Sequence, residues 1–525
     1  MEQDTNDKRV EGLGNTMKQE TNDKKTENLD NTIEQKSNDS KTENPENATE
    51  QETNDINIEN LENALSFFMV PFYYEGTFDK QMKSLWKEEN QKIIKSDYLF
   101  PYITQFLQGQ MDDLIDKQER LSVYCLNDDN DFVKSAWINK FSKCNYVKVD
   151  KDTPEIEFSL LPSGKNSLKK PHLFISDAAN IGILSFCAEI AKEQRTMSNL
   201  KLFNYAMHKI DSQVPKCMNK TLIISGSDTK EAADSTRKLR ELTRSVVALH
   251  NEKKKKKDIQ NEEETEFSWN IKTFIDGLLG DVGLFIPPRI HVFSFIQVDD
   301  TKDNNLGLED FSLDLIKLSK CEKDSYDEID DEDIMNDILQ TYKNIFISSS
   351  VAGTAMIAIA QSQNKGFIRN MDNDALPRYL LIYMLALIQR FTLQYLDIRI
   401  TDVLKKKRSN QLSTLIDTIC SVKVRCLYSE VSPFPQHNLF YQYCCKSFNI
   451  AGHYQEISDK VDLMKTVIMG KREQYLTIFL AILTVLQGTA SLKDIFLNCF
   501  NLTSCISMAI CILAFIGLIY LYKTK

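Results

Sequence analysis

The sequence predicts an α/β (α+β) soluble domain, then long stalk helices and a C-terminal hairpin of two transmembrane helices, assembled as a membrane homo-oligomer. Three observations predict this fold class. Strand-like and helix-like apolar segments alternate between about residues 65 and 345. Helical patterns dominate from about Ala375. Two long uncharged runs close the sequence of 525 residues, which has room for two or three domains.

Residues 1–62 are expected to form a disordered tail built on a repeat of 16 residues. Copies such as QETNDKKTENLDNTIE hold one or two apolar side chains, too few to offset the entropy of ordering the backbone. The alternative is an interaction tether, for which the sequence names no partner.

The overall charge and the cysteines limit the classes of function that are expected for this chain. Lys plus Arg total 64 and Asp plus Glu total 75, giving a formal charge of −11, which argues against direct nucleic-acid binding. The 12 cysteines show neither a C-x-x-C pair nor metal-ligand spacing. These cysteines suit buried thiols better than a disulfide framework, so the soluble part is predicted to lie in the reducing cytoplasm. Because the N-terminus lacks an apolar stretch, no secretory signal peptide is expected.

Residues 63–372 are expected to form the cytoplasmic α/β ligand-sensing domain. Its strands are predicted at 64–76, 121–126, 145–149, 155–161, 171–176, 220–225 and 289–298. Its helices are predicted at 178–194, 229–250 and 268–282. The charged stretch Lys253–Glu266 is interpreted as a solvated insertion between two helices. Residues 345–364 are interpreted as buried strand and turn, with a further membrane span as the alternative.

Residues 373–473 are expected to form long helices and a stalk. The first helix takes Asp374 as its cap, has Pro377 in its first turn and ends in basic residues. A second helix is predicted within 410–428, and a loop at 429–438 separates it from the third. The third carries an apolar seam and has no break before Tyr475, so it is predicted to enter the membrane. The seam consists of Ile457, Val461, Met464 and Ile468.

Residues 474–525 are predicted to form the transmembrane hairpin, with spans at about 474–493 and 502–522. Each run meets the length of about 20 apolar residues that a bilayer requires. Lysine and arginine residues lie before the first span and after the second, whereas the link holds Lys493 alone. The positive-inside rule therefore places both termini in the cytoplasm of a two-pass protein.

The first span carries a polar stripe that is predicted to line a pore. Thr477, Thr484 and Ser491 recur every seven residues, and Gln487 lies near them. In lipid such a stripe turns toward other helices or water. Since two spans per chain cannot enclose a conduit, a ring of subunits is implied. The alternative is that the threonines hydrogen-bond their own backbone.

The layout resembles the CorA family of two-transmembrane transporters. The segments Leu385–Leu396 and Glu456–Leu486 carry the resemblance, which covers about the C-terminal third. It implies a pentamer in the bacterial inner membrane, with pore-lining first spans and a funnel of stalk helices. Family transporters carry Gly-Met-Asn at the outer end of that span, whereas this chain reads LQGTASLKDIF there.

Without that triplet the chain resembles the CorA-like effectors found beside type III CRISPR systems. That likeness implies an antiviral ion channel opened by a nucleotide second messenger bound to the cytoplasmic domain. The alternatives are a divalent-cation (magnesium or cobalt) transporter, for which magnesium is the candidate ion, and a membrane-anchored enzyme or tether. No other cofactor is expected.

The candidate ligand residues lie in and after the turn SGSDT. Ser225 and Ser227 precede a predicted helix, whose N-terminus suits phosphate, although a plain helix cap is the alternative. Three arginines on one face of that helix could grip phosphates, or pair with nearby glutamates as a solvated surface. These are Arg237, Arg240 and Arg244. Arg289 and His291, which open a later strand, are weaker candidates.

No catalytic constellation is found, and the chain is not expected to be an enzyme. The six histidines are scattered and match neither a metalloprotease nor a nucleophile motif. The acidic run Asp324–Asp337 could hold a divalent cation, but lacks the spacing of an EF-hand, and a solvated loop is the alternative.

Overall fold

The computed structural model shows a mixed α/β fold, and all of its described residues belong to one unit, Ile56–Lys525. The structure describes residues 61–74, 85–88, 98–108, 121–127, 129, 145–149, 153–160, 167–176, 179–210, 217–222, 264–269, 271–279, 282–285, 289–300, 306–323, 337–406, 415–420 and 428–496. The predicted repeats of residues 1–62 lie almost entirely outside this range.

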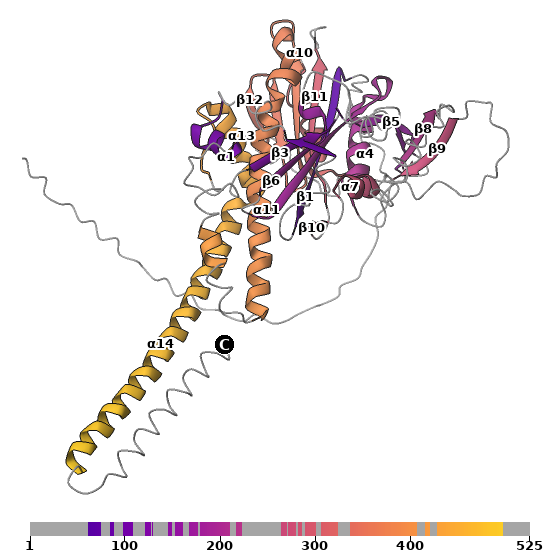
Figure 1. Ribbon diagram of the computed structural model, residues 1–525. Helices are drawn as coiled ribbons and strands as arrows, with labels where there is room; N and C mark the ends of the chain where they lie inside the picture. The colour runs from indigo at the N-terminus through magenta and orange to yellow at the C-terminus, as the bar shows by residue number, and fades with distance from the viewer. Residues whose placement is uncertain are drawn as a thin grey trace, which may run out of the picture. The chain divides into compact units, whose positions relative to one another are not determined.

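A mixed sheet of 14 strands forms the centre of the fold (Figure 1). Its middle strand is β1 (Asn63–Tyr73), which pairs antiparallel with β7 (Ile181–Ile190) on one side and β11 (His291–Asp299) on the other. Beyond β11 lies β14 (Gly353–Ala360), which runs parallel to it. The predicted strands in the described ranges are confirmed within a few residues, because alternating or continuous apolar runs specify strands.

The remaining strands extend the sheet on both sides. Beyond β14 lie β13 (Ile345–Ser349) and β12 (Leu339–Tyr342). Beyond β7 the sheet divides into two branches. The first branch contains β6 (His172–Ser176), β3 (Leu121–Leu126) and β2 (Trp86–Glu88). The second branch contains β5 (Ile156–Leu160), β4 (Asn145–Val147), β8 (Cys217–Leu222) and β9 (Glu264–Trp269). A further short strand, β10 (Gly283–Leu284), pairs with the end of β1.

Helices cover both faces of the sheet, so the core has two parts. Leu65 and Phe67 of β1 belong to the part under α11, whereas Phe68 and Val70 belong to the other part. The first face is covered by α1 (Pro101–Gln108), α10 (Lys365–Asp374), α11 (Leu376–Lys406), α13 (Pro435–Ser447) and the start of α14 (Ile450–Phe496). The second is covered by α4 (Met197–Met207), α7 (Ile271–Leu279) and α8 (Ser312–Lys320); η5 (Ser167–Lys169) and η6 (Lys192–Gln194) are single 3-10 turns.

The helix predicted over residues 178–194 is wrong, because most of this segment forms β7 at the centre of the sheet. Nearly all its side chains are buried, with Phe186 on one face and Cys187 on the other. A strand buried on both faces reads as a continuous apolar run, which periodicity cannot distinguish from a buried helix. A Cβ on Gly182 would meet the Phe72 ring at 2.3 Å, which explains the glycine at this position.

Three smaller predictions also need correction. Asp374 is not a helix cap, since it is the last residue of α10 and α11 follows almost directly. The predicted loop at 429–438 gives way to α13 at Pro435, where proline suits the first helical turn. The insertion predicted up to Glu266 overlaps β9, which pairs with β8, so it does not lie between two helices.

Residues 345–364 are confirmed as buried strand and turn, because they contain β13 and β14. Among the described helices, α11 is long and apolar enough to cross a membrane by composition, over Leu376–Val403 with a mean hydropathy of 1.2. However, 89% of its most apolar stretch is buried inside the protein, as in the core helix of a globular body. A shorter apolar segment, Glu473–Leu486, lies in α14.

Buried histidines make the stability of this body dependent on pH. Burial lowers the pKa of His208 to about 4, whereas an unfolded histidine titrates near 6.5. Below pH 6.5 the unfolded chain therefore binds a proton that the folded chain does not. The free energy of unfolding is expected to fall between pH 6.5 and 4, by about 1.4 kcal/mol per pH unit at most from this residue.

Unfolding of the full chain at pH 7.5, 6 and 5 measures this effect. Carboxylates also titrate in part of this pH range, so the variant His208→Gln is needed to isolate the contribution of the histidine. In this variant the free energy of unfolding is expected to depend less steeply on pH. A slope identical in the native chain and the variant would contradict a neutral His208.

Candidate functional site

Helix α14 has 47 residues, and its side chains are buried in one part and exposed in another. Ile457, Val461 and Met464 are buried against the body, which confirms this part of the predicted seam. From Glu473 to Leu486 the side chains are exposed or half-buried, although most are apolar. The helix is continuous from its packed part into this apolar segment, as the absence of any helix breaker before Tyr475 predicted.

The predicted pore residues lie on this continuous helix. Thr477 and Thr484 are both exposed, and their hydroxyls donate to the carbonyls of Glu473 and Leu480 at 2.8 Å each. This is the local bonding that the sequence left open as an alternative, and it leaves the oxygen lone pairs available to other partners. Gln487 and Ser491 also belong to α14, but their side chains lie outside the described residues.

The predicted ligand and metal sites fall largely outside the described part of the chain. This holds for Ser225, Ser227, Arg237, Arg240 and Arg244, and for the acidic run before Asp337. Within the described ranges, no group of three His, Cys, Asp or Glu side chains is placed to hold a metal ion.

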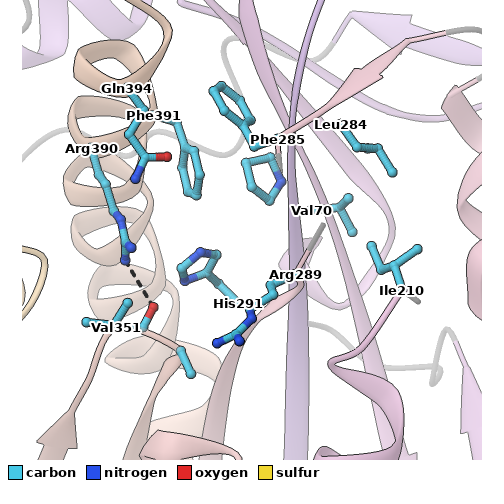
Figure 2. A pocket seen from close by; sticks show the side chains of 12 residues that line it. Val70, Ile210, Leu284, Phe285, Arg289, His291, Val351, Arg390, Phe391 and Gln394 are labelled. Carbon is cyan, nitrogen blue, oxygen red and sulfur yellow. Dashed lines mark hydrogen bonds between the residues drawn. The ribbon is translucent and has the colours of Figure 1, made fainter. Parts of the chain in front are cut away.

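The structure does bring Arg289 and His291 together, at a cavity of about 300 Å³ beside α11 (Figure 2). We call this the basic cavity, because a third basic residue, Arg390 of α11, also lines it. Apart from Gln394, its other walls are apolar. They are formed by Val70, Pro71, Ile210, Leu284, Phe285, Val351, Ala352 and Phe391.

The backbone around β11 positions the first two basic residues. Arg289 forms an isolated antiparallel bridge with Lys209, and the Ile290 N–H donates to the His208 carbonyl at 2.9 Å. His291 then opens β11 opposite Met69 of β1. Because β11 begins here, both residues lie at one end of the central sheet, where α11 passes over it.

Arg390 is held in the wall of the basic cavity by contacts that leave part of its guanidinium without a partner. One terminal nitrogen donates to the Val351 carbonyl at 3.0 Å (Figure 2). The guanidinium carbon lies 5.2 Å from the centre of the Phe448 ring and 5.6 Å from that of Phe391. Its Nε is buried and has no hydrogen-bond partner. Burial also lowers the pKa of Arg390, so the charge is held in a poorly solvated place.

His291 is buried and neutral. Burial lowers its pKa well below 6.5, and the nearby charges of Arg390 and Arg289 lower it further. Its Nδ1 has no hydrogen-bond partner, and its ring lies edge-on to Phe391 at 5.2 Å between centroids. A neutral imidazole offers one donor and one acceptor, so His291 can accompany an anion without adding charge.

The chemistry of the basic cavity suits an anion. Its described lining includes no Asp or Glu, and its ionisable side chains are those of Arg289, His291 and Arg390. Two guanidiniums and one imidazole among apolar walls suit a small organic anion.

Sequence reasoning missed Arg390 and gave Arg289 and His291 little weight. The available signal was Arg390 itself, which stands alone between the uncharged stretches 379–389 and 391–396 of the apolar helix 376–403. A charge in an otherwise apolar, buried helix requires a polar environment, which predicts a cavity or a partner.

Together these features define a mixed α/β protein with a basic cavity beside α11 and a second long helix, α14, whose described C-terminal part is apolar and exposed. No family model, curated protein or solved structure matches this chain.

Proposed function

We propose that the chain is one subunit of a CorA-like inner-membrane ion channel, gated by a nucleotide second messenger that binds its cytoplasmic domain. The observation that carries the proposal is the division of α14 into a packed half and an exposed apolar half. Exposed apolar surface of this extent on a single helix is stabilised by lipid or by other apolar helices.

The length of α14 supports this role. At 1.5 Å per residue, its 47 residues span about 70 Å. Met464 is the last residue of α14 that is described as buried, and the 32 residues of the helix that follow it span about 48 Å. That exceeds the hydrocarbon thickness of about 30 Å, so one helix can act as both stalk and first span.

The rest of the assembly follows from the residues that flank α14. The second span, 502–522, lies outside the described residues, and the basic residues on either side of the hairpin favour cytoplasmic termini. In the proposed pentamer, Thr477, Thr484, Gln487 and Ser491 of each subunit face the conduit. Hydroxyl and amide groups without fixed charge suit a channel of modest selectivity.

The absent Gly-Met-Asn triplet favours a gated effector over a magnesium transporter, which is the second candidate function. An enzyme or tether anchored by the hairpin is the third. The described cavity, which lacks a nucleophile and a carboxylate, favours a ligand-binding role for the soluble domain.

Ion flux through the purified full chain in liposomes tests this proposal. With cyclic oligoadenylates or an S-adenosylmethionine–AMP conjugate, flux is expected to rise at least tenfold over the ligand-free vesicles. Thr484→Leu should reduce that flux several-fold, because it removes a polar group from the conduit. Thr466→Leu is the matched control, since Thr466 makes the same local bond, to the Asp462 carbonyl at 2.9 Å, outside the apolar half.

Magnesium-selective flux without nucleotide would replace this proposal with the transporter. Absence of flux under every condition would favour the anchored enzyme or tether.

A further inference from the structure

The basic cavity concentrates positive charge that no residue of its lining neutralises. Arg289 and Arg390 both line it, and no Asp or Glu is among its described walls. Arg390 is partly buried, and burial of a guanidinium without a carboxylate is costly, so such an arrangement is found where an anion binds. The uncompensated charge predicts an anionic occupant.

Two buried polar atoms around the cavity point to the same occupant. Nδ1 of His291 and Nε of Arg390 have no hydrogen-bond partner, although the His291 ring is buried. Most buried polar atoms in proteins are satisfied, and an exception at a cavity indicates a missing ligand. Figure 2 shows the His291 ring lying between the two arginines.

We propose that the basic cavity binds a small organic phosphate, with its phosphoryl group held by Arg289, His291 and Arg390. A guanidinium presents paired N–H donors that match two oxygens of one phosphoryl group. Leu284, Phe285 and Phe391 offer apolar surface to the organic part. A volume of about 300 Å³ lies at the lower end of the range for ligand pockets, which favours a compact ligand.

Two of the basic side chains of the cavity also contact Phe448, a residue just before the start of α14. Phe448, which caps the C-terminus of α13, lies 5.2 Å from the Arg390 guanidinium and 6.1 Å from the His291 ring. The next residue, Asn449, has a left-handed φ of 50°, and α14 begins at Ile450. Phe448 and Asn449 therefore form the joint between α13 and α14, and Phe448 touches Arg390 and His291 from that joint.

A bound phosphoryl group competes with the Phe448 ring for the Arg390 guanidinium. When Arg390 turns to the phosphoryl group, its cation–π contact with the Phe448 ring is weakened. The ligand-bound and ligand-free states therefore favour different positions of α14. This coupling rests on the proposed function of α14 as a stalk, whereas the binding site itself does not.

Calorimetric titration of the full chain in detergent micelles tests the site. The probes are phenyl phosphate, AMP and inorganic phosphate, with adenosine as an uncharged control. Phenyl phosphate or AMP is expected to bind at least tenfold more tightly than inorganic phosphate, and adenosine not measurably. Arg289→Gln should weaken that binding at least tenfold. Arg289 is exposed, so this variant is expected to remain folded.

Arg399→Gln is the matched control, because Arg399 is an exposed arginine like Arg289, lies on α11 with Arg390, stacks on Tyr395 at 5.9 Å and does not line the cavity. Binding unchanged by Arg289→Gln, or no binding of any phosphate, would overturn the site. Equal binding of inorganic phosphate and AMP would overturn the assignment of an organic ligand.

Hydrogen exchange separates the coupling from the channel proposal. Binding of AMP or phenyl phosphate is expected to change exchange at residues 448–464, and Phe448→Leu should abolish that change while binding persists. Unchanged exchange at 448–464 on binding would overturn the coupling. If the ligand binds and exchange at 448–464 changes but no ion flux is seen, the binding site stands and the channel proposal is wrong. The two proposals can therefore fail separately.

Discussion

Replacing Leu476, Phe479 and Leu480 with arginine, in a chain that ends at Phe496 and so lacks the second predicted span, is expected to move the chain from the membrane fraction to the soluble fraction. All three are exposed in the apolar half of α14. A central arginine costs about 2.5–3.5 kcal/mol in a spanning helix, where leucine contributes about −0.5 kcal/mol. Residues 476–480 lie in the first half of the predicted span, so each exchange costs up to about 3 kcal/mol, and the three costs together oppose insertion of this helix. Fractionation of cells that express each variant is the measurement.

Leu463→Arg is the control that makes this experiment specific. Leu463 lies on the same helix and is 62% exposed, as against 59% for Leu480, but it precedes the apolar half. Arginine at this position is expected to leave the chain in the membrane. Release by Leu463→Arg, or retention of the triple variant, would contradict the membrane role of the apolar half.

The two long apolar helices show what composition can and cannot decide. Helix α11 meets the length and hydropathy of a spanning helix, yet it is buried inside the protein. The apolar half of α14 is shorter in the described range and is exposed. Hydropathy measures the preference of a side chain for an apolar environment, which a protein core satisfies as well as lipid does. Only the packing around each helix distinguishes the two cases.

Local sequence patterns predicted where most strands lie in the sequence, but not which strands pair with each other in the sheet. Strands such as β1 and β11 are marked by β-branched and aromatic residues between turn signals. The parallel pairing of β11 with β14 depends on contacts between distant segments, which no local pattern contains. The same is true of β7, whose apolar run is compatible with a helix until its place between β1 and β6 is known.

The candidate site was only partly predictable for the same reason. Arg289 and His291 are adjacent to a proline pair and a strand, which marked them as weak candidates. Arg390 lies about 100 residues further along, and its approach to His291 is produced by packing α11 across the sheet. The predicted phosphate turn at Ser225 stays a prediction, because it lies outside the described residues.

Gly353→Ala is expected to destabilise the folded body, by about 1–3 kcal/mol as for other overpacked cores. Gly353 opens β14 opposite Val292 of β11, in the parallel pair beside the basic cavity. A Cβ at this position would lie 2.3 Å from the Val292 carbonyl oxygen and 3.3 Å from that of Ser319. Both obstacles are backbone atoms, so no side-chain rotation relieves the clash and the strands must separate.

Gly366→Ala is expected to have the opposite effect on the stability of the same protein. Gly366 lies in α10, where an added Cβ would meet no atom within 4 Å. Alanine in an exposed helix is favoured over glycine by about 0.5–1 kcal/mol, so this variant is expected to be more stable. Urea unfolding of both variants measures the pair. A Gly353→Ala midpoint equal to that of the native chain would mean that β11 and β14 do not approach this closely. The ends of these two strands place His291 beside Ala352, so loosening them is also expected to weaken phosphate binding in the basic cavity.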